Sequence, residues 1–247
     1  MGYIYNEIKI GGIYKNKLGL EFKILEENFS LNRKAFLIEF LNTKTKKVYS
    51  ESVIKLGQIV DFNSPTVNNI GIIGEEFNLN NPNYSTSRIY KTWMKILTRC
   101  CDSTNYNYKY YGEKGIKICE EWKYFPNFYN WFNNQKYKEG ELDKDIIALA
   151  YKMNFKIYSP ETCLLIPARL NQFFITYNNE GSNIRKTSCG YQASIHFGDK
   201  MIRSKYNLSY EEALSEKKRI KKECFLKLSK ELNLDIKLHN LCLKIFE

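Results

Sequence analysis

The segment from Tyr191 to Tyr206 constrains the fold more than any other part of this chain, because its pattern is that of a complete β-hairpin. Two runs of alternating residues flank the dipeptide Gly198-Asp199, which suits a two-residue primed turn. Such a turn fixes the register of the two strands. The predicted pairs are Phe197 with Lys200, His196 with Met201, Ile195 with Ile202, Ser194 with Arg203, Ala193 with Ser204 and Gln192 with Lys205.

This register gives the hairpin two different faces, because side chains alternate along a strand. One face is apolar, and the other carries Gln192, Ser194, His196, Arg203 and Lys205. The sequence Ser209-Tyr-Glu-Glu212 that follows is a capping box and predicts a helix to about Leu232, whose apolar stripe would cover the apolar face. The second face would then offer donors to the bases and phosphates of DNA. The alternative is an exposed sheet that happens to be basic.

The charge of the chain also favours a polyanionic partner. Its 38 Lys and Arg residues outnumber 27 Asp and Glu residues, which gives a net charge of +11. The excess grows along the chain, from 10 basic and 9 acidic residues in 1–84 to 14 and 10 in 85–184, and 14 and 8 in 185–247. The basic run 217–222 suits either a solvated helix face or contacts to the DNA backbone. An AT-rich genome, which favours Lys codons, is an alternative explanation of the excess.

Cysteine spacing and hydropathy limit the class of protein. The seven cysteines form no C-x-x-C pair, so they indicate neither a zinc ribbon nor a disulfide framework, and free thiols in a reducing compartment are expected. The N-terminus lacks the pattern of a signal peptide, and no apolar run approaches the ~20 residues that cross a bilayer. We therefore expect a cytoplasmic protein.

The remaining segments predict an α+β chain. Residues 1–60 indicate a small β domain with strands at 21–25, 35–40 and 47–53, and residues 61–84, rich in Asn, Gly and Pro, indicate a linker. A helix is expected from Ser87 to Cys101, where apolar side chains recur at helical spacing. Further along, Trp122, Phe128, Trp131 and Phe132 are expected in the core.

Several motifs in the middle of the chain occur in a meaningful order. They are Tyr110-Tyr-Gly-Glu-Lys-Gly-Ile-Lys-Ile-Cys-Glu-Glu-Trp122, Leu142-Asp-Lys144, Tyr158-Ser-Pro-Glu-Thr-Cys163 and Pro167-Ala-Arg-Leu-Asn171. Over about residues 85–175 the chain resembles a phage-encoded family of HNH-like endonucleases. The resemblance implies a ββα-metal core over residues 85–180, Mg²⁺ or another divalent cation, hydrolysis of DNA phosphodiesters, and residence in the host cytoplasm.

The same resemblance implies roles for individual residues. Asp143 would be a metal ligand and Asn171 a second one, whereas Lys144 stands where the family has its catalytic His and Thr162 where it has Asn. The pKa of a lysine side chain in water is about 10.4, so Lys144 could act as a base only if its surroundings lowered that pKa strongly. A charged Lys144 would contact phosphate instead. In an extended segment Asp145 would point to the same face as Asp143. The alternative is that these polar residues only cap local structure.

Basic residues of the 85–180 segment are also candidates for DNA contact. Arg99, Lys109 and Lys114 could contact phosphates, and Tyr106, Tyr108, Tyr110 and Tyr111 could stack on bases or lie along phosphates. Ordinary aromatic packing is the alternative.

Residues 185–247 resemble the Apetala-type DNA-binding domain of plant factors and phage homing nucleases. The resemblance rests on Tyr191-x-Ala-x-Ile195, the Gly-containing turn and Glu211-Glu-Ala213, and it implies a three-stranded sheet plus helix that binds the DNA major groove. The sequence thus predicts a metal-dependent, homing-type endonuclease that binds duplex DNA through its C-terminal sheet. Two alternatives remain: a catalytically inactive DNA-binding protein, and a phage host-takeover or inhibitor protein whose residues 1–60 bind another protein.

Overall fold

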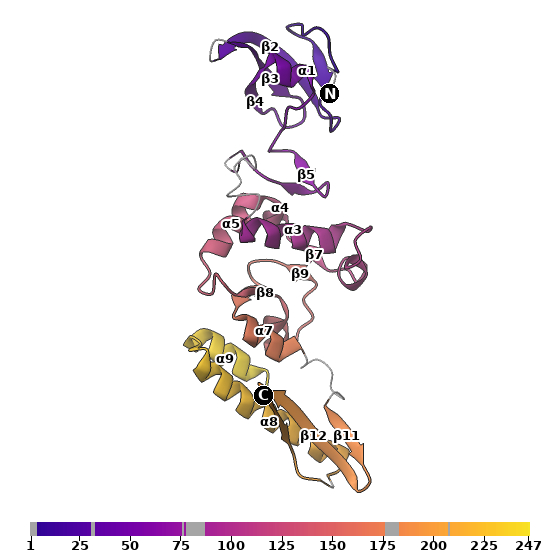
Figure 1. Cartoon of the computed structure of the whole chain (residues 1–247), viewed down its shortest axis with the longest axis vertical. Helices are drawn as coiled ribbons and strands as arrows, with labels where there is room; N and C mark the ends of the chain where they lie inside the picture. Colours follow the sequence, from indigo (N-terminus) through magenta and orange to yellow (C-terminus); the bar gives the residue numbers. More distant parts are fainter. Residues whose placement is uncertain (1–3, 31–32, 76, 78–86, 176–182, 207) are drawn as a thin grey trace. The chain divides into compact units, whose positions relative to one another are not determined.

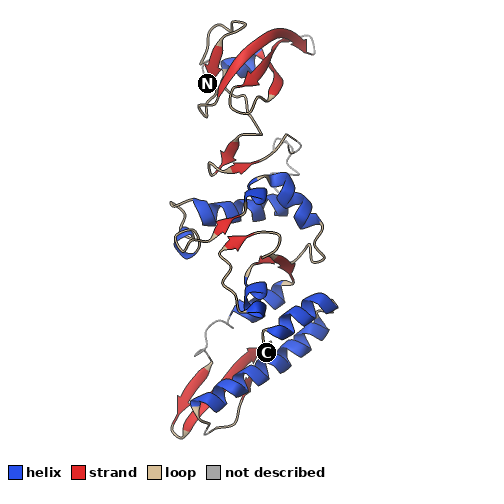
Figure 2. Ribbon diagram, turned by 180° about the vertical axis from the view of Figure 1, so that it is seen from behind, coloured by secondary structure: helices blue, strands red, loops and turns tan. Residues whose placement is uncertain are grey.

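The computed structural model describes residues 4–30, 33–75, 77, 87–175, 183–206 and 208–247 (Figure 1). Helices and several small sheets mix along the chain, as expected for the α+β class (Figure 2). Two compact units are present: unit 1 comprises residues 1–114 and 120–129, and unit 2 comprises residues 115–119 and 130–247. This division cuts through the segment 85–180, which the sequence suggested as one domain.

Unit 1 begins with an antiparallel sheet of strand order β1-β2-β3-β4. Its strands are β1 (Ile13–Lys15), β2 (Glu21–Ser30), β3 (Arg33–Phe40) and β4 (Lys46–Ser50). Alternation along β2 and β3 buries Phe22, Ile24 and Phe36 in one apolar cluster, which explains why these segments form strands. The strands predicted at 21–25 and 35–40 lie within β2 and β3 and are confirmed.

The third expected strand ends earlier than predicted. Residues 51–53 belong to the short helix α1 (Glu51–Lys55) instead. An i,i+4 ion pair of 3.0 Å joins Glu51 Oε1 to Lys55 Nζ, with the acidic residue at the helix start and the basic residue at its end. These charges favour a helical turn that the alternating pattern alone did not reveal.

The described part of the expected linker contains structure. Strands β5 (Pro65–Val67) and β6 (Gly71–Ile72) pair antiparallel. The buried carboxylate of Asp61 accepts hydrogen bonds from Thr43 Oγ1 (2.6 Å) and Ser64 Oγ (2.8 Å). The Thr43 bond ties the segment to the turn between β3 and β4, so residues 61–75 are folded and do not form the linker predicted over 61–84; residues 76 and 78–84 of that prediction lie outside the described residues.

The rest of unit 1 is mainly helical. Helix α3 (Arg88–Cys101) is close to the predicted one, and the Ser87 side chain caps it by accepting from the Tyr90 N–H. The 3₁₀ turn η1 (Tyr108–Tyr110), helix α4 (Glu120–Lys123) and helix α5 (Phe125–Asn133) follow, with α5 ending in unit 2. The indole of Trp93 donates to the Trp122 carbonyl (2.6 Å). Both indoles are buried, as are Phe128 and Phe132.

Unit 2 opens with two small sheets. Strand β7 (Lys117–Ile118) pairs parallel with β9 (Ile157–Tyr158), and β8 (Glu141–Asp143) pairs antiparallel with β10 (Leu164–Ile166). Helix α6 (Asp145–Tyr151) leaves the end of β8, and helix α7 (Ala168–Ile175) follows β10. An antiparallel strand pair followed by a helix is the chain order expected of a ββα element.

The C-terminal part contains the predicted hairpin. Strands β11 (Ile184–Thr187), β12 (Gly190–Phe197) and β13 (Lys200–Arg203) form an antiparallel sheet of that order. All four pairs of the β12–β13 ladder match the predicted register. Gly198 has a φ of 58°, as the first central position of a type II′ turn requires. Because β13 ends at Arg203, the two remaining predicted pairs lie beyond the ladder.

One apolar core holds the C-terminal sheet and its neighbours together. Helix α8 (Tyr210–Glu231) starts at the predicted capping box and packs on β12 through Ile195, Ile220 and Phe225. The same core receives buried side chains from β10, α7 and helix α9 (Ile236–Lys244), which the sequence did not predict. The β8–β10–α7 element and the C-terminal sheet are therefore parts of one folded unit.

Among the described residues, no helix combines the length and apolar composition needed to cross a bilayer.

Gly140 precedes β8 at a point of close backbone approach. A Cβ added there would lie 2.3 Å from the Ile166 carbonyl oxygen. Since backbone cannot yield as a side chain does, we expect Gly140→Ala to lower the free energy of unfolding by about 1–3 kcal/mol, as overpacking does. Urea unfolding measures this change, and Lys156→Ala, at an exposed side chain, is the control. Equal stability of Gly140→Ala and wild type would contradict the packing described here.

Candidate nucleic-acid interface

Helix α8 packs along one face of the C-terminal sheet (Figure 1). The other face is polar and exposed. On the covered face, Ala193 and Ile195 are buried. Directly paired residues share a face, so the exposed face includes three cross-strand pairs besides that of Thr187 with Gly190. They are Arg185 with Gln192, Ser194 with Arg203, and His196 with Met201. Arg185, His196, Met201 and Arg203 are solvent-exposed, which gives this face two guanidinium groups beside polar and apolar side chains.

Gln192 does not present its amide to solvent as predicted, because its side chain is only 1% exposed. The Arg185 guanidinium donates to Gln192 Oε1 through Nε (3.2 Å) and Nη2 (3.0 Å), and Gln192 Nε2 donates to the Ser204 carbonyl (3.0 Å). Both ends of the amide are thus used within the protein. Gln192 therefore positions the Arg185 side chain.

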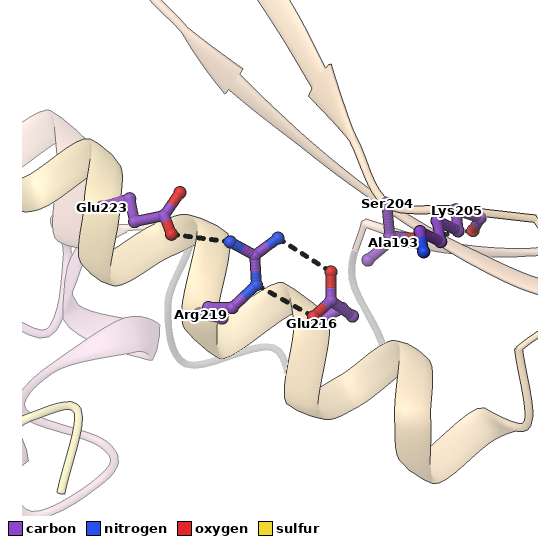
Figure 3. A network of polar contacts seen from close by, with 6 residues as sticks. All are labelled: Ala193, Ser204, Lys205, Glu216, Arg219 and Glu223. Atoms are coloured by element: carbon purple, nitrogen blue, oxygen red, sulfur yellow. Dashed lines mark hydrogen bonds and ion pairs between the residues drawn. The ribbon is translucent and has the colours of Figure 1, made fainter.

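Lys205 lies beyond the end of β13 and so is not part of the sheet face to which the sequence assigned it. Its carbonyl accepts a hydrogen bond from Ser204 Oγ (3.0 Å), and Figure 3 shows it beside Ser204. The pKa of Glu216 lies below its usual value, mainly because of the hydrogen bonds from Arg219, with smaller contributions from the charges of Arg219 and Lys205. Lys205 is exposed and remains available to a phosphate group.

The basic run 217–222 on α8 is not one solvated face. Arg219 is clamped on the exposed side by Glu216 (2.9 Å at Nε and at Nη2) and Glu223 (2.6 Å at Nη1), as Figure 3 shows. Lys217 and Lys221 are buried. Lys221 Nζ donates to the Phe173 carbonyl (2.6 Å), and burial lowers the Lys221 pKa to about 8. The expectation of a DNA-backbone contact therefore survives only at Lys218 and Lys222, the exposed lysines of the run.

Asp143 is the last residue of β8, and its carboxylate caps the start of helix α6. Asp143 Oδ1 accepts hydrogen bonds from the backbone N–H groups of Asp145 (3.0 Å) and Ile146 (2.8 Å), and the residue is only 8% exposed. Burial raises the Asp143 pKa, against the lowering effect of these two hydrogen bonds. The local reason for the arrangement is helix capping, which Asp commonly provides.

Asp145 is not the second carboxylate of one strand face, as the sequence suggested. Asp145 is the first residue of α6, and the strand ends before it. Its carboxylate lies 2.5 Å from Lys144 Nζ, so these two side chains form an ion pair. The helix start, which Asp143 stabilises, turns Asp145 out of the extended conformation that the prediction assumed.

Asn171 on α7 contacts a different carboxylate from the one predicted. Its Nδ2 donates to Glu141 Oε2 (2.7 Å), at the other end of β8 from Asp143. Within the ranges that the structure describes, no three His, Cys, Asp or Glu side chains are grouped to hold a metal ion. Asp143 and Asn171 are thus held by different partners, the backbone at the start of α6 and the Glu141 carboxylate.

Thr162, which replaces the Asn of the HNH-like pattern, has a structural role. Thr162 Oγ1 donates to the Ile157 carbonyl (2.7 Å) and accepts from the Ser159 N–H (3.1 Å). The hydroxyl thus closes the turn between β9 and β10. The neighbouring Cys163 thiol has its pKa raised to about 12 by burial, so it stays protonated and unreactive at neutral pH.

Arg99, Lys109 and Lys114 belong to unit 1, whereas the C-terminal sheet belongs to unit 2. Arg99 Nε donates to the Lys95 carbonyl (3.1 Å), and its guanidinium lies 4.9 Å from the centre of the Tyr111 ring. Lys109 and Lys114 lie over tyrosine rings of the loop that contains η1. The two lysines thus surround Tyr106 and Tyr110, whereas Arg99 contacts the Tyr111 ring.

Two members of the exposed sheet face escaped the sequence prediction. Arg185 lies on β11, whose four residues Ile184-Arg-Lys-Thr187 are too short to give a clear alternating pattern. Met201 was paired correctly with His196, but its apolar side chain was not assigned to the polar face. The predicted pairing of Met201 with His196 already places both on one face, because paired residues share a face.

No protein-family model, curated protein or solved structure matches this chain.

Asp143 gives a test of the capping role. At neutral pH we expect Asp143→Ala to cost about 0.5–2 kcal/mol of folding free energy because a helix cap is lost, whereas Asp143→Asn retains the acceptor. The raised pKa of Asp143 means that its ionisation opposes folding. Wild type should therefore lose stability relative to Asp143→Asn as the pH rises from about 4 through the folded-state pKa.

Urea unfolding of wild type and both variants over this pH range measures the effect. A stability difference between wild type and Asp143→Asn that does not change with pH would show that Asp143 titrates normally in the folded protein.

Proposed function

We propose that this protein binds duplex DNA through the exposed face of the β11-β12-β13 sheet. The observation that carries the proposal is the division of this sheet: α8 covers its apolar face, while exposed Arg185, His196 and Arg203 lie together on the other. A rigid sheet that projects such donors can follow the major groove, which admits a β-ribbon. The three pairs of the face would lie across the groove.

The charge of the C-terminal segment supports a DNA partner. Residues 185–247 contain 14 basic and 8 acidic residues. Arg219 is paired with Glu216 and Glu223, whereas Lys200, Lys205 and Lys222 are exposed. Lysine contacts to phosphates would supply affinity that depends on salt and not on sequence.

The chemistry of the face supports direct reading of bases. An Arg side chain can donate two hydrogen bonds to guanine, a Ser hydroxyl can donate or accept, and an apolar side chain can contact the methyl group of thymine. Arg203, Ser194 and Met201 supply these three kinds of contact on neighbouring pairs of the sheet. We propose Arg203 as the principal base contact, because it is exposed and lies at the edge strand.

If the exposed sheet face contacts bases, substitutions on it should lower the sequence specificity of DNA binding. After selection of a preferred duplex from a random library, Arg203→Ala with His196→Ala should reduce the preference for that duplex over a random one by about 5- to 150-fold or more, because loss of the Arg203 base contact alone is worth about 1–3 kcal/mol. Lys222→Ala, the control, should weaken binding to both duplexes alike. Fluorescence anisotropy at two salt concentrations measures both affinities. An unchanged ratio in the double variant would reject the sheet as the reader.

Metal-dependent DNA cleavage is a second candidate function. The observation in its favour is the chain order of β8, β10 and α7, which is that of a ββα element carrying Asp143 and Asn171. Against it stand the capping role of Asp143, the bond of Asn171 to Glu141 and the Lys at position 144. We therefore propose binding without cleavage as the main function.

A plasmid-nicking assay distinguishes the two candidates. We expect wild type to leave supercoiled plasmid intact in Mg²⁺ or Mn²⁺, as in EDTA, because Asp143 caps α6, Asn171 bonds to Glu141 and Lys144 replaces the imidazole base. Lys144→His tests whether the missing imidazole alone limits activity, and we expect no nicking from it either. Nicking by wild type that requires the metal and disappears in Asp143→Ala would instead establish the endonuclease.

A further inference from the structure

A pair of exposed tyrosines follows the end of α3 in unit 1. Tyr106 is 70% exposed and Tyr110 is 46% exposed. Their ring centres are 5.8 Å apart at an interplanar angle of 66°, and their hydroxyl oxygens are 3.2 Å apart. The two rings contact each other on the surface and contribute little to the core.

Two lysines accompany these rings. Lys109 Nζ lies 3.9 Å from the centre of the Tyr106 ring and 4.9 Å from that of Tyr110, and Lys114 Nζ lies 5.9 Å from that of Tyr110. We call these four residues, Tyr106, Lys109, Tyr110 and Lys114, the tyrosine–lysine cluster. Cation–π contacts at such exposed sites are weak, so a ligand can displace the ammonium groups at low cost.

The loop that carries the cluster is held firmly against α3. Gly112 N donates to the Arg99 carbonyl (3.2 Å), and a Cβ at Gly112 would lie 2.4 Å from the Cys100 carbonyl oxygen. Side chains at the start of the loop also bond to its backbone: Asp102 Oδ1 accepts from Thr104 N, and Asn105 Oδ1 from Asn107 N. The exposed rings are therefore presented on a fixed support.

We propose that the tyrosine–lysine cluster binds unpaired bases of single-stranded DNA. Exposed ring faces suit bases that are not already stacked in a duplex, and neighbouring cations suit the phosphates between them. On binding, a base would take the place of an ammonium over a ring, and the lysine would move to a phosphate. The inference rests on the nucleic-acid partner of the proposed function, but it concerns a different unit and a different form of DNA.

Binding of a short labelled oligothymidylate to the full-length protein tests this proposal. We expect Tyr106→Ala with Tyr110→Ala to weaken this binding about tenfold or more, since stacking on an aromatic side chain contributes about 1–3 kcal/mol per base. Tyr106→Phe with Tyr110→Phe should bind nearly as wild type, because the rings remain. Lys109→Ala should weaken binding and reduce its dependence on salt.

Tyr151 provides a matched control, because it is 53% exposed and has Lys244 Nζ 4.6 Å from its ring centre in unit 2. Tyr151→Ala should bind the oligonucleotide as wild type does. Equal affinity of the Tyr106 and Tyr110 alanine variant and wild type would overturn the proposal, as would a wild type that binds duplex but not oligothymidylate. Binding of oligothymidylate without duplex would instead reject the sheet reader and leave this inference standing.

Discussion

Burial of the apolar face of β12 is the interaction on which unit 2 depends. Ile195 contacts a core that also receives Ile166 from β10, Leu170 from α7 and Phe225 from α8. Because packed interiors tolerate few voids, these elements must keep their mutual positions for the core to remain filled. The exposed face of the sheet and the β8–β10–α7 element are therefore fixed relative to each other by the same apolar contacts.

The hairpin and α8 were predictable because local rules determine them. A two-residue turn fixes a register, alternation then assigns the faces, and a capping box marks a helix start. Helix α9 was missed although Asp235 caps it, accepting from the N–H groups of Lys237 and Leu238. Its apolar residues meet their partners only in the folded core, and short segments carry too little pattern to reveal this in advance.

The candidate site residues were harder to predict. Their roles depend on contacts with residues distant in sequence, or on where a strand ends and a helix begins. A run of similar lysines on α8 divides into buried and exposed members, since residues three or four apart share a helix side and neighbours do not. Gln192 lies on the predicted face, but its amide is hydrogen-bonded to the Arg185 guanidinium and the Ser204 carbonyl. For Asp143 and Asp145, the error came from extending a strand across a helix start.

The Gln192 amide has a consequence for how the sheet would meet a ligand. It joins the Arg185 side chain on β11 to the chain just beyond β13, across the central strand. An arginine restrained in this way loses less side-chain freedom on binding than a mobile one, so less of the interaction energy is spent on ordering it. Arg203, exposed at the opposite edge, keeps more freedom to adapt. One edge of the sheet would thus act as a preorganised contact and the other as an adjustable one.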